Sequence, residues 1–311
     1  MAVFNTEVTL DRASQPDLLN LVLRRAELLA NSDATLPLST AAADQSDELA
    51  SVTAELKIRL ESAPMAVRRL TLGEPGDLCD RLALAEPIHP FAASSPTDRE
   101  ADIADRFAPD RRCFVLEHPL LRGHPLNVVW VALLDSRPAA IPQILDPNRT
   151  QLDPSDATTA VFYSIWNVEP GLSGIPGGAS LLTGAMDLLT SEFPGLSQFV
   201  TLSPIPGYRA WLSQEQAVTH SPEELLKSCA QYLCSLGETG RPIDPVARFH
   251  LGNGARLVQI NAQADLSDRG VERSFGIMAN YLYEPEDRAA NQAAVRQGSI
   301  PIGDQVQELL D

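Results

Sequence analysis

Apolar residues recur at helical spacing in two segments near the N-terminus, over residues 17–30 and 48–62. In both segments leucine and valine fall near one face of the predicted turn, which indicates two amphipathic helices. Residues 32–46 between them are rich in Ala, Ser, Thr and Asp, a composition typical of a linker. Because two helices alone bury little apolar surface, we expect them to pack on a partner chain or on the residues that follow.

From about Met65 the pattern changes to short runs of β-branched and aromatic residues that alternate with helical segments. Runs of strand length occur at 66–72, 112–116, 128–134, 159–166, 198–202, 256–261 and 274–282. Helices are expected up to Leu84, over the apolar positions from Leu181 to Leu189, after Pro206 and over 221–236. This mixture predicts an α+β fold: a mixed, mostly antiparallel sheet flanked by helices, with one strand–glycine turn–helix unit.

The charge balance of the chain excludes several kinds of partner. Of the 311 residues, 41 are Asp or Glu and 24 are Lys or Arg, a formal net charge of −17. Nucleic acid and anionic lipid surfaces both attract dense Lys and Arg, so we expect neither a nucleic-acid nor a membrane partner. A polyanionic ligand would have to meet a local basic patch or the backbone amides of a helix N-terminus.

The cysteines and the N-terminal residues bear on the cellular compartment. The 4 cysteines form no CxxC pair and no Cys/His ligand spacing, which predicts reduced thiols and no zinc site. HExxH and EF-hand patterns are also missing, so no metal is expected. The first residues lack the basic start and apolar run of a signal peptide, and the longest apolar run, 128–134, is too short for a bilayer. These features predict a cytoplasmic protein.

A glycine-rich turn at 171–178 follows a predicted strand and precedes a predicted helix. Such a turn presents backbone N–H groups at the positive end of the helix dipole, where a pyrophosphate can bind without lysine. Its spacing matches neither GxGxxG nor the P-loop. Spacing alone therefore favours a tight turn that needs glycine for its backbone angles.

Two further residues are candidates for chemistry. His250 lies between Phe249 and Leu251, and a single histidine between apolar residues is more often a buried structural residue. Ser203 precedes a proline, and the Gly-x-Ser-x-Gly nucleophile motif is missing from the chain, so a turn-forming serine is the simpler interpretation. The other histidines, His89, His118, His124 and His220, are isolated.

Taken together, ordered motifs over most of the chain resemble the malonyl-CoA decarboxylase family. They are Val67-Arg68-Arg69-Leu70-Thr71, Ile88-His89-Pro90, Asp110-Arg111-Arg112-Cys113-Phe114, Phe162-Tyr163-Ser164-Ile165, Gly171-Leu172-x-Gly174-Ile175, Thr201-Leu202-Ser203-Pro204-Ile205-Pro206-Gly207-Tyr208, Asp244-Pro245-Val246-Ala247-x-Phe249-His250-Leu251 and Gly276-Ile277-Met278-Ala279-Asn280-Tyr281-Leu282-Tyr283. The resemblance runs in order from about Met65 to about Tyr283, and its Ser-Pro-Ile-Pro-Gly and Phe-His-Leu motifs are specific.

The resemblance implies a GNAT-like fold that binds an acyl-CoA, with Ser203 and His250 as the catalytic pair. By the same resemblance Tyr283 lines the substrate site. The CoA pyrophosphate would be held by the glycine turn, at Ser173, Gly174, Ile175, Pro176, Gly177, Gly178 and Ala179. Loss of CO2 from malonyl-CoA leaves a thioester enolate that needs hydrogen-bond donors at its oxygen and a proton at its carbon. His250, expected to titrate near neutrality, would supply that proton. Ser203 would hydrogen-bond the malonyl carboxylate or His250 and so hold the carboxylate out of the thioester plane.

The resemblance also implies a domain organisation and a set of partners. Residues 1–64 would form a helical region for oligomerisation or packing, and 65–311 the catalytic domain. The expected partner is malonyl-CoA or a related acyl thioester, in a homo-oligomer. No cofactor is expected, since the family uses no biotin, ATP, metal or thiamine.

This sequence departs from the family pattern in three respects. Pro176 and Gly177 stand where the family carries an acidic residue in the glycine turn. Ser203 and His250 are 47 residues apart, a short spacing, and the N-terminal region is abbreviated to two helices. A specialised substrate, such as methylmalonyl-CoA or a carrier-bound acyl group, would fit these differences. The alternatives are a GNAT-type acyltransferase and a noncatalytic acyl-CoA-binding protein.

Overall fold

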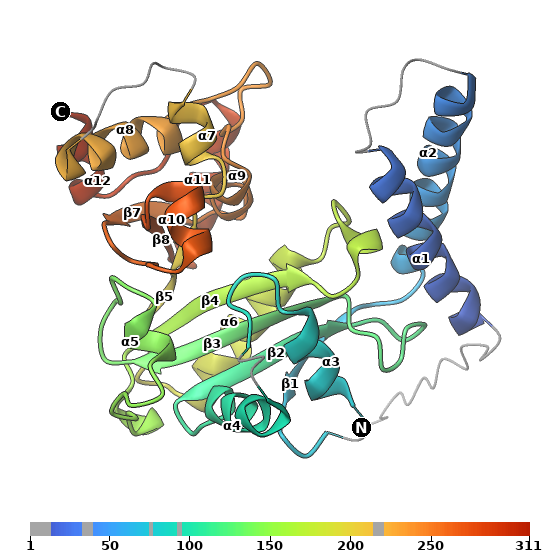
Figure 1. Cartoon of the computed structure of the whole chain (residues 1–311), viewed down its shortest axis with the longest axis horizontal. Coiled ribbons are helices and arrows are strands. Elements are labelled where there is room, and N and C mark those ends of the chain that lie inside the picture. Colours follow the sequence, from blue (N-terminus) through green and yellow to red (C-terminus); the bar gives the residue numbers. More distant parts are fainter. Residues whose placement is uncertain (1–13, 33–39, 75–76, 92–94, 214–220) are drawn as a thin grey trace, which may run out of the picture. The chain divides into compact units, whose positions relative to one another are not determined.

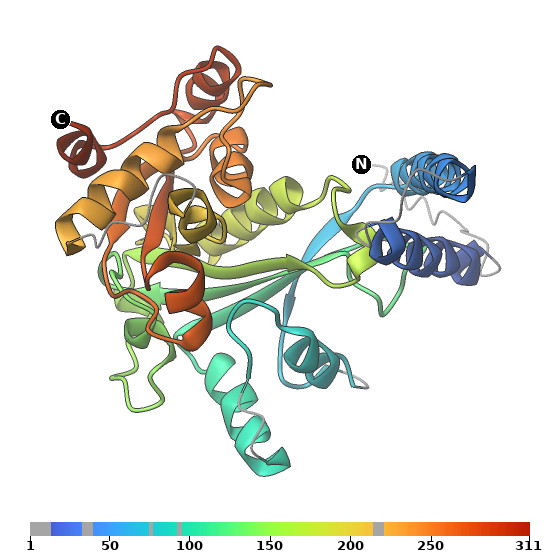
Figure 2. The same cartoon turned by 45° about the horizontal axis from the view of Figure 1, so that its top comes forward.

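The computed structural model describes residues 14–32, 40–74, 77–91, 95–213 and 221–311 (Figures 1 and 2). The helices are α1 (Ser14–Ser32), α2 (Thr40–Glu61), α3 (Leu78–Ala85), α4 (Pro96–Arg106), α5 (Pro142–Leu145), α6 (Gly178–Glu192), α7 (Tyr208–Leu212), α8 (Pro222–Cys234), α9 (Pro245–Gly252), α10 (Asp268–Ser274), α11 (Arg288–Arg296) and α12 (Asp304–Leu310), with the 3-10 turns η1 (Pro154–Asp156) and η2 (Pro170–Leu172). The strands are β1 (Ala66–Leu70), β2 (Arg111–Glu117), β3 (Asn127–Leu134), β4 (Thr159–Asn167), β5 (Gln198–Thr201), β6 (Ser203–Pro204), β7 (Arg256–Asn261) and β8 (Met278–Tyr283).

The strands form one mixed sheet with the order β1-β2-β3-β4-β5-β8-β6, and β7 pairs with β8. β1 is antiparallel to β2, β4 is parallel to β5, and β8 is antiparallel to β5, β6 and β7. The predicted α+β fold with a mostly antiparallel sheet is therefore confirmed. None of the helices that the structure describes is long and apolar enough to cross a membrane.

The chain divides into two compact units, and the division passes through β2, β3 and β4. The first unit contains residues 1–103, 113–129 and 165–187, and the second contains 104–112, 130–164 and 188–311. In the first unit α1 and α2 lie side by side in both views (Figures 1 and 2). The apolar stripes predicted for these helices are buried, as Leu18, Val22, Leu28, Leu56 and Leu60.

In the second unit β8 is a fully buried strand. β7 pairs with one edge of β8, and β5 and β6 pair one after the other with its opposite edge. Helices α8, α9 and α12 pack against β7. The core between these elements includes Leu233, Leu251, Leu257 and Tyr281. This packing brings residues that are far apart in the sequence around one strand.

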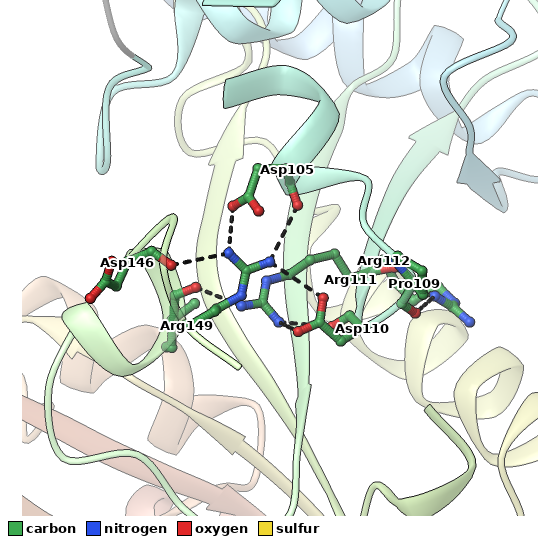
Figure 3. Close-up of polar contacts among 8 residues, drawn as sticks. Asp105, Pro109, Asp110, Arg111, Arg112, Asp146 and Arg149 are labelled. Carbon is green, nitrogen blue, oxygen red and sulfur yellow. Dashed lines mark hydrogen bonds and ion pairs between the residues drawn. The ribbon is translucent and has the colours of Figure 1, made fainter. Parts of the chain in front are cut away.

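A buried network of ion pairs also belongs to the second unit (Figure 3). Arg149 contacts Asp105 at 2.6 Å and Asp110 at 3.3 Å, and Arg111 contacts Asp110 at 2.9 Å. Arg111 also donates to the carbonyl of Ile144 at 2.6 Å. Since a buried guanidinium is stable only when it is paired and hydrogen-bonded, the network holds the start of β2 to the segment after α5.

Several predicted boundaries differ from the structure. Helix α2 begins at Thr40, so the second half of the predicted linker is helical, while residues 33–39 lie outside the described part. The strand predicted from 274 begins only at Met278, because α10 ends at Ser274 and a left-handed turn at Phe275, φ 55°, and Gly276, φ 76°, follows it.

Candidate functional site

Ser203 lies in β6, the short strand that pairs with the same edge of β8 as β5 does. Val200 pairs with Leu282, and Ser203 pairs with Ala279, so the register is the same on both sides of a short interruption. Ser203 is 5% exposed. Its hydroxyl donates to the hydroxyl of Thr201, with the two oxygens 2.9 Å apart.

His250 is placed by helix α9. Pro245 occupies the first turn, and the buried carboxylate of Asp244 accepts hydrogen bonds from the N–H groups of Val246 and Ala247, at 2.9 Å and 2.8 Å. These are N-cap contacts, which fix where the helix begins. The cap therefore sets the position of His250 in the last turn, where its side chain is buried.

The structure brings Ser203, His250 and Tyr283 together. His250 Nε2 lies 3.1 Å from Ser203 Oγ, and His250 Nδ1 lies 2.8 Å from the phenol oxygen of Tyr283. Tyr281 stacks on the imidazole ring, with ring centroids 4.7 Å apart and an interplanar angle of 24°. Three residues from β6, α9 and β8 thus form one hydrogen-bonded cluster, which the sequence predicted only through the family resemblance.

Burial keeps this cluster uncharged. It lowers the pKa of His250 to about 3 and raises the pKa values of Tyr281 and Tyr283 above that of an exposed tyrosine. Among the residues that the structure describes, no carboxylate interacts with His250 to offset the desolvation of an imidazolium. The expectation that His250 titrates near neutrality is therefore wrong for the free protein, in which its imidazole is neutral.

The glycine turn belongs to the first unit, whereas Ser203, His250 and Tyr283 belong to the second. Ser173, Gly174, Ile175, Pro176 and Gly177 connect η2 to α6, and Gly178 and Ala179 begin that helix. Gly174 has φ 71°, a left-handed conformation that favours glycine. At Gly177 a Cβ would collide with the side-chain oxygen of Asn127. The turn therefore needs glycine for its geometry, and it also precedes the N–H groups of a 15-residue helix.

Sequence reasoning missed two residues that contact these groups. Arg25 on α1 donates to the carbonyls of Gly171 and Ser173, at 2.6 Å and 2.8 Å, and to the hydroxyl of Thr53 at 2.8 Å. It is buried, and its place within the apolar stripe of α1 was an available signal. The other is Thr201, two positions before Ser203.

Within the described part of the chain, no group of three or more His, Cys, Asp and Glu side chains is placed to hold a metal ion. His89 and His118 are buried outside the cluster, and His220 lies outside the described residues. His250 is therefore the histidine that the structure associates with Ser203 and Tyr283.

Comparisons with known proteins agree with the motifs. The family model described as the malonyl-CoA decarboxylase C-terminal domain matches residues 66–227 and 219–311. The mitochondrial malonyl-CoA decarboxylase of Anser anser anser is 31% identical over 280 residues, which cover 73% of this chain and 54% of the relative. The mouse enzyme is 29% identical over 275 residues and is also covered to 54%. The chain thus spans about half the length of these curated relatives.

Solved structures are similar over more of the chain. The malonyl-CoA decarboxylase of Rhodopseudomonas palustris has a TM-score of 0.83 and 33% identity, and the match covers 94% of this chain and 75% of that one. The enzyme of Agrobacterium vitis has a TM-score of 0.81 at the same identity, with 94% and 76% covered. The residues matched by the family model include the elements that carry Ser203, His250 and Tyr283.

Proposed function

Since the chain belongs to the malonyl-CoA decarboxylase family, we propose that it removes CO2 from malonyl-CoA and leaves acetyl-CoA. The observation that carries the proposal is the buried cluster in which His250 contacts both Ser203 and Tyr283. The two hydrogen bonds satisfy both ring nitrogens of the buried imidazole and fix its orientation, as a group that transfers a proton to substrate requires. The same cluster lies in the motifs that the sequence shares with the family.

The reaction requires the protein to stabilise an oxyanion and to deliver a proton to carbon. As the bond between the carboxylate and the methylene carbon breaks, its electron pair moves into the thioester carbonyl and forms an enolate. Hydrogen-bond donors at the developing oxyanion typically contribute a factor of about 10² to 10³. The methylene carbon must then receive one proton, which balances the departure of neutral CO2 from a carboxylate. Ser203 and His250 supply N–H and O–H groups in a buried setting, where such donors act most strongly.

When substrate is bound, the hydroxyl of Ser203 turns its proton from Thr201 to the malonyl carboxylate and holds that group out of the thioester plane, so that the breaking bond overlaps the carbonyl π system. His250 supplies the proton from the N–H of its neutral imidazole, the same ionisation state in which a histidine of triosephosphate isomerase polarises the substrate carbonyl. As the Nε2 proton leaves, the phenol of Tyr283, 2.8 Å from His250 Nδ1, donates its proton to Nδ1. A solvent proton taken up at Nε2 after the reaction then sends the Nδ1 proton back to the phenolate, which restores the starting state. Burial raises the pKa of this phenol, so Tyr283 begins the cycle protonated.

The glycine turn from Ser173 to Ala179 binds the CoA pyrophosphate in this proposal. The support is its position before the first turn of α6, where backbone N–H groups and the helix dipole favour an anion. Such a site suits a chain with a formal charge of −17. The substitution of Pro176 for the acidic residue of the family makes methylmalonyl-CoA and carrier-bound malonyl groups the substrates to test next.

Three further expectations belong to the proposal. The thioester carbonyl itself accepts the electron pair, so the reaction uses no cofactor, and activity will persist after treatment with a chelator. Residues 1–64 act as a helical region that joins copies of the chain, while 65–311 carry the site. The protein works in the cytoplasm, although the curated relatives are named as mitochondrial.

The test is to incubate the purified chain with malonyl-CoA in D2O and to identify the CoA thioesters by mass spectrometry. The proposal predicts acetyl-CoA that carries one deuterium in its methyl group. Acyl transfer to an added amine or alcohol acceptor, without release of CO2 from malonyl-CoA, would support an acyltransferase instead. Tight binding of acyl-CoA without any turnover would support a noncatalytic binding protein.

A further inference from the structure

The hydroxyl of Thr201 lies at the end of the hydrogen-bonded chain that begins at Tyr283. We propose that Thr201 is a positioning residue, which sets the direction of donation through His250 and Ser203 by accepting the hydroxyl proton of Ser203. Its effect on catalysis rests on the function proposed above. The direction itself is a property of the free protein and is tested separately.

Thr201 is held where the backbone ladder between β8 and its neighbours is interrupted. The ladder is in the same register before and after Thr201 and Leu202. At the interruption, side chains make bonds to the neighbouring backbone. The Thr201 hydroxyl accepts from the N–H of Tyr281 at 3.2 Å, and the Asn280 side chain donates to the Thr201 carbonyl at 2.7 Å. Thr201 is fully buried, and these two hydrogen bonds fix the position of its side chain beside Ser203.

A row of amides behind Thr201 makes this arrangement rigid. Asn261 donates to the side-chain oxygen of Asn280 at 2.6 Å, and Gln259 donates to that of Asn261 at 2.7 Å. Asn280 also donates to the carbonyl of Pro138 at 3.2 Å. Each amide thus has its orientation set by the next, and the Thr201 backbone cannot shift without breaking buried hydrogen bonds.

The direction follows from counting protons. A serine hydroxyl has one proton, and Ser203 donates it to Thr201. The bond between Ser203 and His250 must then use a proton of the imidazole, so Nε2 is protonated and donates to Ser203. In a neutral imidazole the other nitrogen has no proton, so Nδ1 accepts from the phenol of Tyr283.

This direction matters because the reverse one is the arrangement of serine hydrolases. There an unprotonated histidine nitrogen accepts the serine proton and makes the serine a nucleophile. With Thr201 as acceptor, His250 Nε2 keeps its proton, and Ser203 is not activated to attack the thioester. The proton on Nε2 remains available for the substrate carbon.

The test uses the near-isosteric variant Thr201→Val, with Thr201→Ser as its matched control. The valine variant removes the acceptor, so Ser203 turns its proton toward His250 Nε2, and the imidazole proton moves to Nδ1. The serine variant keeps the acceptor. Protein labelled with ¹⁵N at histidine distinguishes the two tautomers by NMR, and His250→Gln assigns the signal among the 5 histidines. Turnover of malonyl-CoA is measured on the same samples.

We expect the Nε2–H tautomer in the wild type and in Thr201→Ser, and the Nδ1–H tautomer in Thr201→Val. We expect kcat to fall by about 10- to 100-fold in the valine variant, with KM within about threefold, since a misdirected donor mainly affects the reacting geometry. In a Ser203→Ala background the valine substitution should not change the tautomer further.

An Nδ1–H tautomer in the wild type would overturn the inference, and so would an unchanged tautomer or an unchanged kcat in folded Thr201→Val. If Thr201→Val fails to fold, the Ser203→Ala variant decides. With Thr201 still in place, the loss of Ser203 should leave His250 Nε2 without its partner and change its ¹⁵N shift. An unchanged shift would contradict the hydrogen bond between Ser203 and His250 on which the inference depends. If the wild type does not turn over malonyl-CoA, the proposed function is wrong. The His250 tautomers of the wild type and the Thr201 variants would still test whether Thr201 sets the direction of donation.

Discussion

His250 Nδ1 lies 2.8 Å from the phenol oxygen of Tyr283, a residue 33 positions later in the chain. Tyr281, on the same strand, instead stacks its ring on the imidazole. The hydroxyl of Tyr281 is buried and makes no hydrogen bond to any residue that the structure describes. Two tyrosines therefore contact one histidine through different parts of their side chains.

This difference predicts opposite outcomes for two equivalent substitutions. Tyr283→Phe removes the donor to His250 Nδ1, so kcat should fall by up to about 100-fold while the ring packing stays intact. Tyr281→Phe removes a buried hydroxyl without a partner, and it should leave kcat unchanged and stability equal or higher. Steady-state kinetics and thermal unfolding of the two variants check this. An unchanged kcat in both variants would show that only the packing of the rings matters, and equal losses would show that the contact with His250 Nδ1 has no special role.

Substitution of His250 should separate chemistry from binding. In His250→Ala we expect turnover to fall by about 10² to 10⁴-fold, the usual contribution of a positioned acid. The affinity for CoA, measured by calorimetry, should change little, because the proposed pyrophosphate site lies at Ser173 to Ala179. A parallel collapse of affinity and turnover would make His250 a structural or binding residue.

The ionisation of His250 predicts a pH dependence. Its pKa in the folded protein is lowered to about 3 by burial, from the ordinary histidine value of 6.5. Between these values the unfolded chain binds the proton and the folded protein does not. The stability that the neutral imidazole contributes is thus fully present above about pH 6.5, and it is lost as the pH falls toward 3.

For a single group this loss is at most about 1.4 kcal/mol per pH unit. His250→Gln should therefore flatten the fall in the free energy of unfolding between pH 6.5 and 4.5. His118, whose pKa burial also lowers, keeps contributing in that variant. The measurement is urea unfolding at several pH values, together with the ¹⁵N shifts of His250. An imidazole that becomes charged near pH 6 in the free protein would contradict the prediction.

Arg25 should link the N-terminal helices to the glycine turn. Arg25→Met removes the donors to the carbonyls of Gly171 and Ser173, which should destabilise the first unit by about 2–4 kcal/mol and weaken CoA binding. The control is Arg24→Met. Arg24 is half-exposed and pairs with Glu27 and Glu48 at the surface, so its loss should leave both properties close to those of the wild type.

Hydrogen exchange at the amides of 171–175 and calorimetric titration with CoA measure these effects. Faster exchange and weaker binding in Arg25→Met alone would support the link. If the two arginine variants behave alike, Arg25 does not hold the turn.

The sequence predicted the elements with strong periodicity and missed those that depend on tertiary contacts. The strand at 128–134 and the helix from 221 matched β3 and α8 closely, because each has a continuous apolar pattern or clear caps. Helix α9 was missed, since it is only 8 residues long and is fixed by the Asp244 cap. The left-handed Phe275 was missed as well, because aromatic residues rarely adopt that conformation.

In the candidate site, too, the residue identities could be predicted from the sequence, while their contacts and ionisation could not. Ser203, His250 and Tyr283 were found through the family motifs, and no spacing rule would have joined residues from β6, α9 and β8. The ionisation of His250 was predicted wrongly, because its desolvation depends on packing against Tyr281 and the surrounding core. Thr201 was part of a quoted motif, yet its role depends on an interruption in a strand ladder that only three-dimensional register can show.

The most direct test of the central claim is to convert malonyl-CoA labelled with ¹³C at its free carboxyl carbon, using the wild type, Ser203→Ala and His250→Ala. Mass spectrometry then follows the CoA thioesters and the released CO2. We expect acetyl-CoA and labelled CO2 in equal amounts from the wild type, with both lost in the two variants. Malonyl-CoA left intact by the folded wild type, or undiminished conversion in either variant, would contradict a decarboxylase that acts through Ser203 and His250.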